Sequence, residues 1–179
     1  MSNFWINANV TPKRNFRFII QLGDDILWYG KTAKLPAVTF GETEHHFLDN
    51  KYYFPGKPTW EEVSITLVDP GTPDATAKLW TMLQDQGYEV KGDKNNHRTI
   101  SKTKAVDPVN GIGAVQIQVL KDDGTPVETW ELKRAFIKSI SFSDLDYANE
   151  ELREITLGLR YDWAECKIGN TEFFKPISG

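Results

Sequence analysis

The clearest pattern in the chain runs from Glu154 to Trp163, where apolar and polar positions alternate without a break. Strict alternation is typical of a strand with one buried face. We therefore predict a long strand whose apolar side belongs to the core and whose polar side meets water or another subunit. The apolar positions are Ile155, Leu157, Leu159, Tyr161 and Trp163, and the polar face holds Glu154, Thr156, Gly158, Arg160 and Asp162.

Similar strand patterns recur along most of the chain. Gly23-Asp24-Asp25 separates two of them and Asp123-Gly124 two others, and both sequences favour tight hairpin turns. Between Pro36, which lacks a backbone donor, and Tyr52, we expect only a polar connection over residues 41–51. The predicted strands cover residues 16–22, 26–29, 52–56, 63–67, 115–120, 127–136, 137–142 and 154–163.

One helix is predicted at about residues 73–86. Thr72 is suited to cap its first turn, Pro73 fits the first helical position, and Asp74 complements the positive end of the helix dipole. Gly87 is suited to end the helix. Its apolar stripe is typical of a helix that lies across a sheet, and the stripe consists of Ala75, Leu79, Met82 and Leu83 with Trp80 at its margin.

Residues 87–110 form a long polar segment without periodicity. Such a segment inside a compact domain is usually functional or becomes ordered only against a partner. Its cations are candidate contacts to phosphates, but the aromatic stacking platforms that single-strand binders use are sparse here. We therefore favour a solvated or subunit-facing loop over nucleic-acid binding. The cations are Lys91, Lys94, Arg98, Lys102 and Lys104.

Length and charge narrow the class of protein. With 179 residues the chain suits one well-filled core, so we predict a single domain over residues 1–179. The net charge of −4 does not favour a sequence-independent grip on phosphates. Cys166 is the only cysteine, which excludes an internal disulfide and indicates an inert thiol. The sequence predicts neither a signal peptide nor a membrane span.

Motifs for catalysis and for cofactors are missing. The chain has no G-x-S-x-G, P-loop, H-E-x-x-H or paired-cysteine motif. The adjacent His45 and His46 would point to opposite faces of a strand, so they do not readily share one metal ion. The sequence therefore predicts no enzyme, no cofactor and no metal site.

Four segments, taken in order, give the chain a likeness to a known family. They are RNFRF at residues 14–18, KLPA at 34–37, FPGKPTWEEVSITL at 54–67 and EITLGLRYDW at 154–163. Together they resemble the tail tube proteins of contractile-tailed bacteriophages. That family is related in fold to the inner tubes of extracellular contractile injection systems and of type VI secretion. The resemblance covers roughly residues 15–165.

The resemblance implies a structural virion protein with an antiparallel β-sandwich or barrel-like domain and one flanking helix. In such tubes, hexameric rings stack into a hollow conduit for genome ejection, and each subunit contributes strands to a continuous inner barrel. The implied partners are further copies of the chain, sheath protein, baseplate and tail terminator proteins, and DNA that passes without specific binding. The implied location is the virion tail, assembled in the host cytoplasm, with no membrane partner.

Two alternatives to a tube subunit stay open. A baseplate protein of the same fold would start the tube as a single ring, and a nucleic-acid-binding β-barrel would use the basic residues 91–104. Candidates for a subunit seam or a lumen wall are Glu154, Thr156, Arg160 and Asp162. The C-terminal extension, residues 167–179, has no counterpart in the family. Either its Phe173 and Phe174 dock on a neighbouring subunit, or this end is unstructured.

Overall fold

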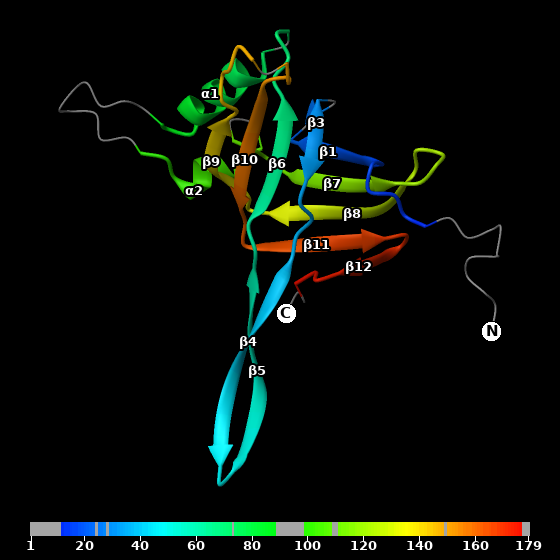
Figure 1. Ribbon diagram of the computed structural model, residues 1–179, viewed down its shortest axis with the longest axis vertical. Helices are drawn as coiled ribbons and strands as arrows, with labels where there is room; N and C mark the ends of the chain where they lie inside the picture. Colours follow the sequence, from blue (N-terminus) through cyan, green and yellow to red (C-terminus); the bar gives the residue numbers. More distant parts are fainter. Residues whose placement is uncertain are drawn as a thin grey trace.

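Two antiparallel sheets and a long separate hairpin build the molecule (Figure 1). The computed structural model describes residues 12–23, 25–27, 29–72, 74–88, 99–108, 111–148 and 150–176. The strands are β1 (Phe18–Leu22), β2 (Asp25–Ile26), β3 (Gly30–Ala33), β4 (Val38–Phe47), β5 (Asn50–Trp60), β6 (Val63–Val68), β7 (Val115–Leu120), β8 (Pro126–Lys133), β9 (Phe136–Phe142), β10 (Glu154–Arg160), β11 (Trp163–Ile168) and β12 (Thr171–Phe173). The helices are α1 (Ala75–Asp85) and α2 (Lys102–Ala105).

The two sheets pack face to face around one apolar core. The six-stranded sheet has the order β12-β11-β8-β7-β1-β2, and the four-stranded sheet has the order β3-β6-β10-β9. Their strands run across one another in Figure 1. The predicted β-sandwich is confirmed, and in the described part of the chain the sheets do not close into a barrel. The core includes Ile20, Leu22, Val63, Ile65, Leu67, Ile117, Leu132, Ile155, Leu157 and Leu159.

The chain changes sheet at two corners that the alternation did not reveal. The predicted strand 154–163 ends at Arg160, turns at Tyr161 and Asp162, and re-enters the other sheet as β11. Likewise β8 ends before Arg134, whose φ of 54° turns the chain into β9. The single strands predicted at 154–163 and 127–136 are therefore wrong at their ends. The alternation changes phase at the corner after Arg160, because Ala164 and Cys166 are buried in the core of the second sheet. Trp163, predicted as a core residue, instead lies on the outer face beside Glu165, so that prediction is wrong.

Helix α1 covers one end of the core as predicted, but its cap differs. The carboxylate of Asp74 accepts the backbone N–H of Ala77 at 2.9 Å, so Asp74 and not Thr72 is the N-cap. Gly87 follows the C-cap with a φ of +99°, which confirms its predicted role. Pro73 lies outside the described residues. Ala75, Leu79 and Leu83 are buried, and Trp80 is 41% exposed at the edge of the stripe.

The described half of the predicted loop 87–110 is anchored to the body. Ser101 caps the short helix α2, and Ala105 behind it is 1% exposed. The N–H of Ile112 donates to the carbonyl of Ala105 at 3.0 Å, which joins the end of this segment to the core. Within the described ranges, neither helix has the length and the apolar content that crossing a bilayer requires.

The largest correction concerns residues 41–51, which form no simple connection. They belong to β4 and β5, and these strands pair with each other from Val38 and Trp60 to Phe47 and Asn50. The predicted hairpin near residue 23 is confirmed in shorter form, because β1 pairs with β2 through only two residue pairs.

We expect Leu157→Asp to prevent folding. Leu157 has no exposed surface and pairs with β6 and β9 at the centre of the four-stranded sheet. A buried carboxylate without a partner costs about 3–5 kcal/mol, a large part of a typical domain's stability. Circular dichroism and the soluble yield measure the loss. The exposed Ser64 lies on the neighbouring strand, so Ser64→Asp is the control and should fold normally. A folded Leu157→Asp protein would contradict the assignment of this face to the core.

Candidate assembly interface

The β4–β5 hairpin projects from the sandwich as an arm (Figure 1). Its two strands form a sheet of their own and belong to neither of the larger sheets. Nearly every residue along both strands is exposed. An isolated two-stranded hairpin is at best marginally stable in water, because it lacks a third strand or a helix to pack against. The arm therefore has the properties of an element that is completed by another molecule.

The exposed side chains of the arm are unusually apolar. Six large apolar side chains on it are each at least 49% exposed. Large apolar side chains gathered on one exposed element mark interaction sites in soluble proteins, and aromatic residues are enriched at protein interfaces. We therefore take the arm as the candidate assembly interface. Its apolar residues are Phe40, Phe47, Leu48, Tyr52, Tyr53 and Phe54.

Leu48 lies in the turn at the tip of the arm, where its φ is 53°. The left-handed conformation costs a leucine about 1 kcal/mol or more, and hairpin turns normally place Asn, Asp or Gly there. The Leu48 side chain is also 85% exposed, so no packing within the subunit offsets this cost. Within a single subunit, leucine is therefore an unfavourable residue for this turn.

Two glycines let the strands of the arm approach closely near its base. A Cβ on Gly56 would lie 2.8 Å from the carbonyl carbon of Gly41. The register shifts at this point, between Phe40 and Glu42, which indicates a β-bulge. Bulges increase the local twist of a hairpin. The glycines thus permit the sharp twist that Figure 1 shows between the base and the distal part of the arm.

One carboxylate on the arm, that of Glu44, is paired within the arm. The carboxylate of Glu44 lies 2.7 Å from the Lys51 ammonium and 2.7 Å from Nε2 of His46. His46 therefore pairs with a carboxylate. His45 precedes it on the same strand. No group of three or more His, Cys, Asp or Glu side chains placed to hold a metal ion occurs among the described residues.

An aromatic cluster joins the base of the arm to the sandwich and to the C-terminal segment. The ring of Trp60, at the end of β5, lies 6.1 Å from Tyr161 and 5.5 Å from Phe174. Phe174 also stacks on Trp130 with 6.5 Å between ring centroids. Such pairs contribute about 0.5–1.5 kcal/mol each beyond their buried area. The arm therefore leaves the body from a fixed aromatic base.

The described part of the C-terminal extension, residues 167–176, contains the end of β11 and the strand β12. β12 pairs with β11 and forms an edge of the six-stranded sheet. The alternative of an unstructured end is therefore wrong for these residues. Phe174, with a φ of 62°, contacts its own subunit, and Phe173 remains 42% exposed.

The phenol of Tyr161 is buried in this base. Its hydroxyl has no hydrogen-bond partner among the described residues. Burial raises the pKa of Tyr161 to about 12, with a further rise from the charge of Glu61 that Arg160 opposes. Burial also raises the pKa of the Cys166 thiol, which disfavours the reactive thiolate, in keeping with the predicted inert cysteine.

The polar face of β10 is engaged mostly within its own subunit. Glu154 pairs with Lys31, and the hydroxyls of Thr156 and Thr66 lie 3.4 Å apart. The predicted candidate Arg160 is exposed to solvent at the end of the strand. The alternation predicted this polar face but not the partners that it has within the subunit.

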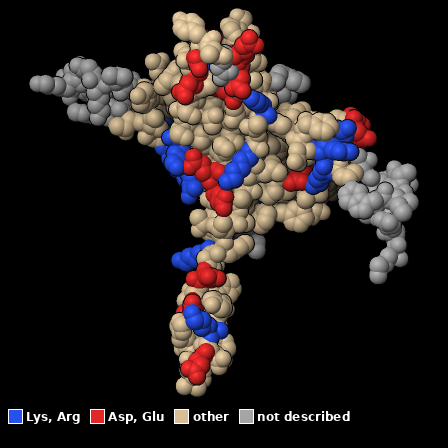
Figure 2. Space-filling view, in the orientation of Figure 1, with Lys and Arg blue, Asp and Glu red and all other residues tan. Residues whose placement is uncertain are grey.

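Further ion pairs on the same side of the four-stranded sheet balance its charge. Lys34 lies 3.0 Å from Glu61, and Lys138 lies 2.5 Å from Glu62. Figure 2 shows both signs of charge close together at the foot of this sheet. Exposed pairs of this kind add little stability, but they leave the surface nearly neutral.

The basic loop does not form a free cationic patch in its described part. Asp162 binds the Lys102 ammonium at 2.6 Å, and Arg134 lies 3.8 Å from the same carboxylate. Asp162 therefore connects α2 to the corner between β8 and β9. Lys104 is exposed on α2. The other predicted contacts, Lys91, Lys94 and Arg98, lie outside the described residues.

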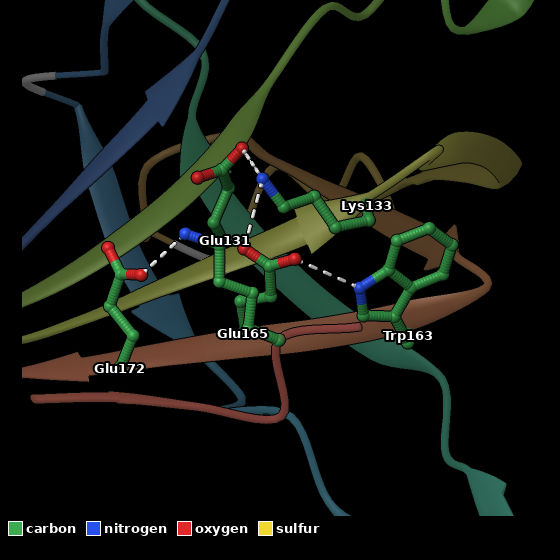
Figure 3. A network of polar contacts seen from close by, with 6 residues as sticks. Glu131, Lys133, Trp163, Glu165 and Glu172 are labelled. Atoms are coloured by element: carbon green, nitrogen blue, oxygen red, sulfur yellow. Dashed lines mark hydrogen bonds and ion pairs between the residues drawn. The ribbon is translucent and has the colours of Figure 1, made fainter. Parts of the chain in front are cut away.

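The outer face of the six-stranded sheet carries a separate polar network (Figure 3). Lys133 lies 2.5 Å from Glu131 on its own strand and 3.3 Å from Glu165 on β11. Glu165 also accepts the indole N–H of Trp163 at 3.2 Å. Burial opposes the charge of Lys133, but the two carboxylates outweigh it and raise the pKa of the ammonium. The network stabilises pairing between strands and presents no reactive group.

Sequence reasoning missed the arm because its pattern is atypical for a strand. Both faces of β4 and β5 are exposed, so apolar residues do not follow a period of two. The turn at Leu48 and Asp49 also lacks glycine and proline. The run Tyr52-Tyr53-Phe54 was the available signal, because aromatic residues favour strands.

No family model and no curated protein matches the chain. Its fold is nevertheless found in solved contractile injection systems. A chain in the structure of the anti-feeding prophage cap, described as the AFP tube terminating cap, has a TM-score of 0.64 at 16% identity, covering 94% of this chain and 100% of that chain. A chain in the AFP baseplate has a TM-score of 0.63 at 15% identity, covering 88% and 97%.

A third structure, the PVC sheath-tube complex in its extended state, contains a chain with a TM-score of 0.61 at 16% identity, covering 88% of this chain and 92% of that chain. At such identities the likeness establishes the fold alone. The fold predicted from the resemblance to tail tube proteins is thereby confirmed.

We expect Tyr161→Phe to change the alkaline stability of the protein. Between pH 10 and 12 the unfolded tyrosine loses its proton while the folded one keeps it, so stability is full below pH 10 and falls above it. In Tyr161→Phe the part of the alkaline loss of stability that comes from this phenol should disappear. At pH 7 the substitution should not lower the free energy of unfolding, because the hydroxyl that it removes has no hydrogen-bond partner. Denaturant unfolding at pH 7 to 12 measures both effects. Tyr53→Phe on the exposed arm is the control. A clear loss of stability in Tyr161→Phe at pH 7 would contradict the prediction.

Proposed function

We propose that this protein is a structural subunit that polymerises, as stacked rings, into the hollow tube of a contractile tail. The β4–β5 arm carries the proposal, because it is a long apolar hairpin that its own subunit leaves uncovered. The shared fold supports it, since structures with this fold include a tube terminating cap and a sheath-tube complex. The role is structural and not enzymatic.

The arm is the element that joins copies. A large apolar side chain contributes about 1.5–3 kcal/mol when it is fully buried, so even partial cover of six such residues is a substantial driving force. An arm that docks on a different surface of the next copy makes a heterologous contact. Contacts of this kind repeat from copy to copy and produce a closed ring or an open polymer, and not a two-fold dimer.

Lateral contacts close each ring through the edges of the four-stranded sheet. β3 and β9 are the outer strands of this sheet. Unpaired edges invite uncontrolled association, and pairing between neighbouring subunits removes them. Six subunits joined in this way give the hexameric ring that the resemblance implies.

The polar face of the four-stranded sheet lines the lumen. Cross-strand neighbours on it are hydroxyl side chains, such as Thr66, Thr156 and Ser141, and its carboxylates pair with lysines. A surface that is polar and nearly neutral offers DNA phosphates no cationic grip, so genome passes without specific binding. In this arrangement Glu154, Thr156 and Arg160 belong to the lumen wall, and Asp162 fixes the corner beside it.

The proposal places the protein in a phage virion, where sheath, baseplate and terminator proteins are its further partners. An initiator of the baseplate would differ in behaviour, because it would form one ring and stop. Nothing in the described part of the basic loop favours the nucleic-acid-binding alternative, since Asp162 holds Lys102.

We expect removal of the arm to abolish tube formation without unfolding the body. Replacing residues 41–57 with Asn-Gly joins Phe40 to Pro58, which are paired in the hairpin. Negative-stain microscopy of the purified wild type should show hollow tubes, and the shortened protein should show none. Thermal unfolding of both proteins provides the control for folding. Normal tubes from the shortened protein would overturn the role of the arm, and single rings from the wild type would favour the initiator.

We expect Arg160→Glu to leave a folded subunit but to alter polymerisation. Arg160 is exposed at the end of β10, so reversing its charge does not disturb the core. On the lumen side, the substitution replaces six positive charges per ring with six negative ones, and these carboxylates repel each other across a narrow space. Tube length and the critical concentration for assembly measure the effect. Lys121→Glu, on the exposed turn before β8, is the matched control. Tubes of normal length from Arg160→Glu would exclude this face from any assembled surface.

A further inference from the structure

The C-terminal segment crosses the base of the arm. We use the name C-terminal strap for residues 171–176, which consist of β12 and the three residues after it. A tight turn at Gly169, with a φ of 58°, folds the strap back along β11. In Figure 1 the end of β12 lies beside the point where the arm leaves the body. The end of the chain and the base of the arm therefore meet at one place.

Backbone pairing and charge hold the C-terminal strap only weakly. β12 pairs with β11 through three residue pairs, and every residue of β12 is exposed. The ion pair between Lys175 and Glu172 at 2.8 Å lies within the strap, so it does not fasten the strap to the sandwich. Lys175 is the main cause of the lowered pKa of Glu172, and Lys167 and Lys133 on the body contribute less. Segments with few buried contacts and exposed backbone pairs open locally at a low free energy.

The ring of Phe174 is the anchor of the C-terminal strap. It lies edge-on to Trp60 at 5.5 Å and stacks on Trp130 at 6.5 Å between ring centroids. Trp60 is the last residue of β5, so the docked ring holds the strand that leads into the arm. The strap therefore fixes the direction in which the arm leaves the body.

Two unfavourable features accompany the docked strap. Phe174 has a φ of 62°, a left-handed conformation that is costly for a residue other than glycine. The buried hydroxyl of Tyr161, whose ring contacts Trp60, has no hydrogen-bond partner among the described residues. Release of Phe174 removes the first cost, and movement of Trp60 away from Tyr161 lets water reach the hydroxyl. Strain of this kind is typical of segments that switch between two arrangements.

We propose that the C-terminal strap is a releasable clamp, docked on the base of the arm in the free subunit and released when the subunit joins the tube. Release frees the direction of the arm, so the arm adjusts to the surface that covers it. The assembly half of this inference rests on the proposed function. The opening of the strap is a property of the single subunit and is tested separately.

The only cysteine of the chain reports whether the strap opens. Cys166 is buried on β11 and is paired across the sheet with Phe173 of β12. Burial raises the pKa of its thiol, so the docked state reacts slowly with thiol reagents. Release of β12 makes β11 the edge of the six-stranded sheet and gives a reagent access to Cys166.

The substitution Phe174→Ala tests the anchor. Because the variant loses two ring contacts, we expect a thiol reagent to label Cys166 at least about tenfold faster than in the wild type. Circular dichroism should show that the protein stays folded during labelling. Phe16→Ala, which removes an exposed ring far from the strap in the sequence, is the control and should label at the wild-type rate. Equal rates in Phe174→Ala and the wild type would overturn the proposal.

A reversible disulfide tests the role of release in assembly. Phe173→Cys places a second thiol directly across from Cys166, and paired residues of antiparallel strands lie within the Cα separation that a disulfide spans. We expect the oxidised protein to form at least about tenfold fewer tubes in negative-stain images than the same protein after reduction. Phe173→Ser loses the same ring without a lock, so it should form tubes equally under both conditions. Normal tubes from the locked protein would overturn the proposal.

The two experiments distinguish this inference from the proposed function. A wild type that forms neither tubes nor rings would contradict the tube role, and labelling of Cys166 would still decide whether the strap opens. Tubes from the wild type and from the locked protein alike would leave the tube role intact and remove only the clamp.

Discussion

The structure depends on the burial of two sheets against each other across a single core. β10 occupies the centre of one sheet, and its Ile155, Leu157 and Leu159 have no exposed surface. Because the sheets share one core, the chain can leave one and enter the other at the corners near Arg134 and Asp162 without exposing apolar residues. The sandwich is thereby complete in itself, and the remaining parts of the molecule are free to serve contacts with other copies.

The arm follows a different physical rule. It has backbone pairing but no core, and the aromatic cluster around Trp60 holds only its base. A subunit with a self-sufficient body and a dependent arm folds alone and is completed by neighbours. That division suits a polymer, because assembly then buries the apolar side chains of the arm that remain exposed in the folded subunit. The strained Leu48 at the tip is the sharpest sign of this division.

Charge plays a smaller part than the sequence suggested. Lysines and carboxylates on the polar face of the four-stranded sheet pair within the subunit, and Asp162 engages Lys102 from the basic loop. The mildly acidic net charge therefore does not describe this surface, which is nearly neutral. Net charge is a sum over the whole chain, whereas a ligand or a passing polymer meets only the local arrangement.

The sequence alone determined the strands that bury one face, helix α1 and its end at Gly87, and the likeness to a tube fold, because periodicity and turn chemistry are local. Only the tertiary structure decided where strands change sheet, since Tyr161 is buried whether the chain runs straight or turns. It alone revealed the arm, because strands exposed on both faces carry no hydrophobic period. It also placed Phe174 on its own subunit against Trp60, which depends on a contact between segments far apart in the chain.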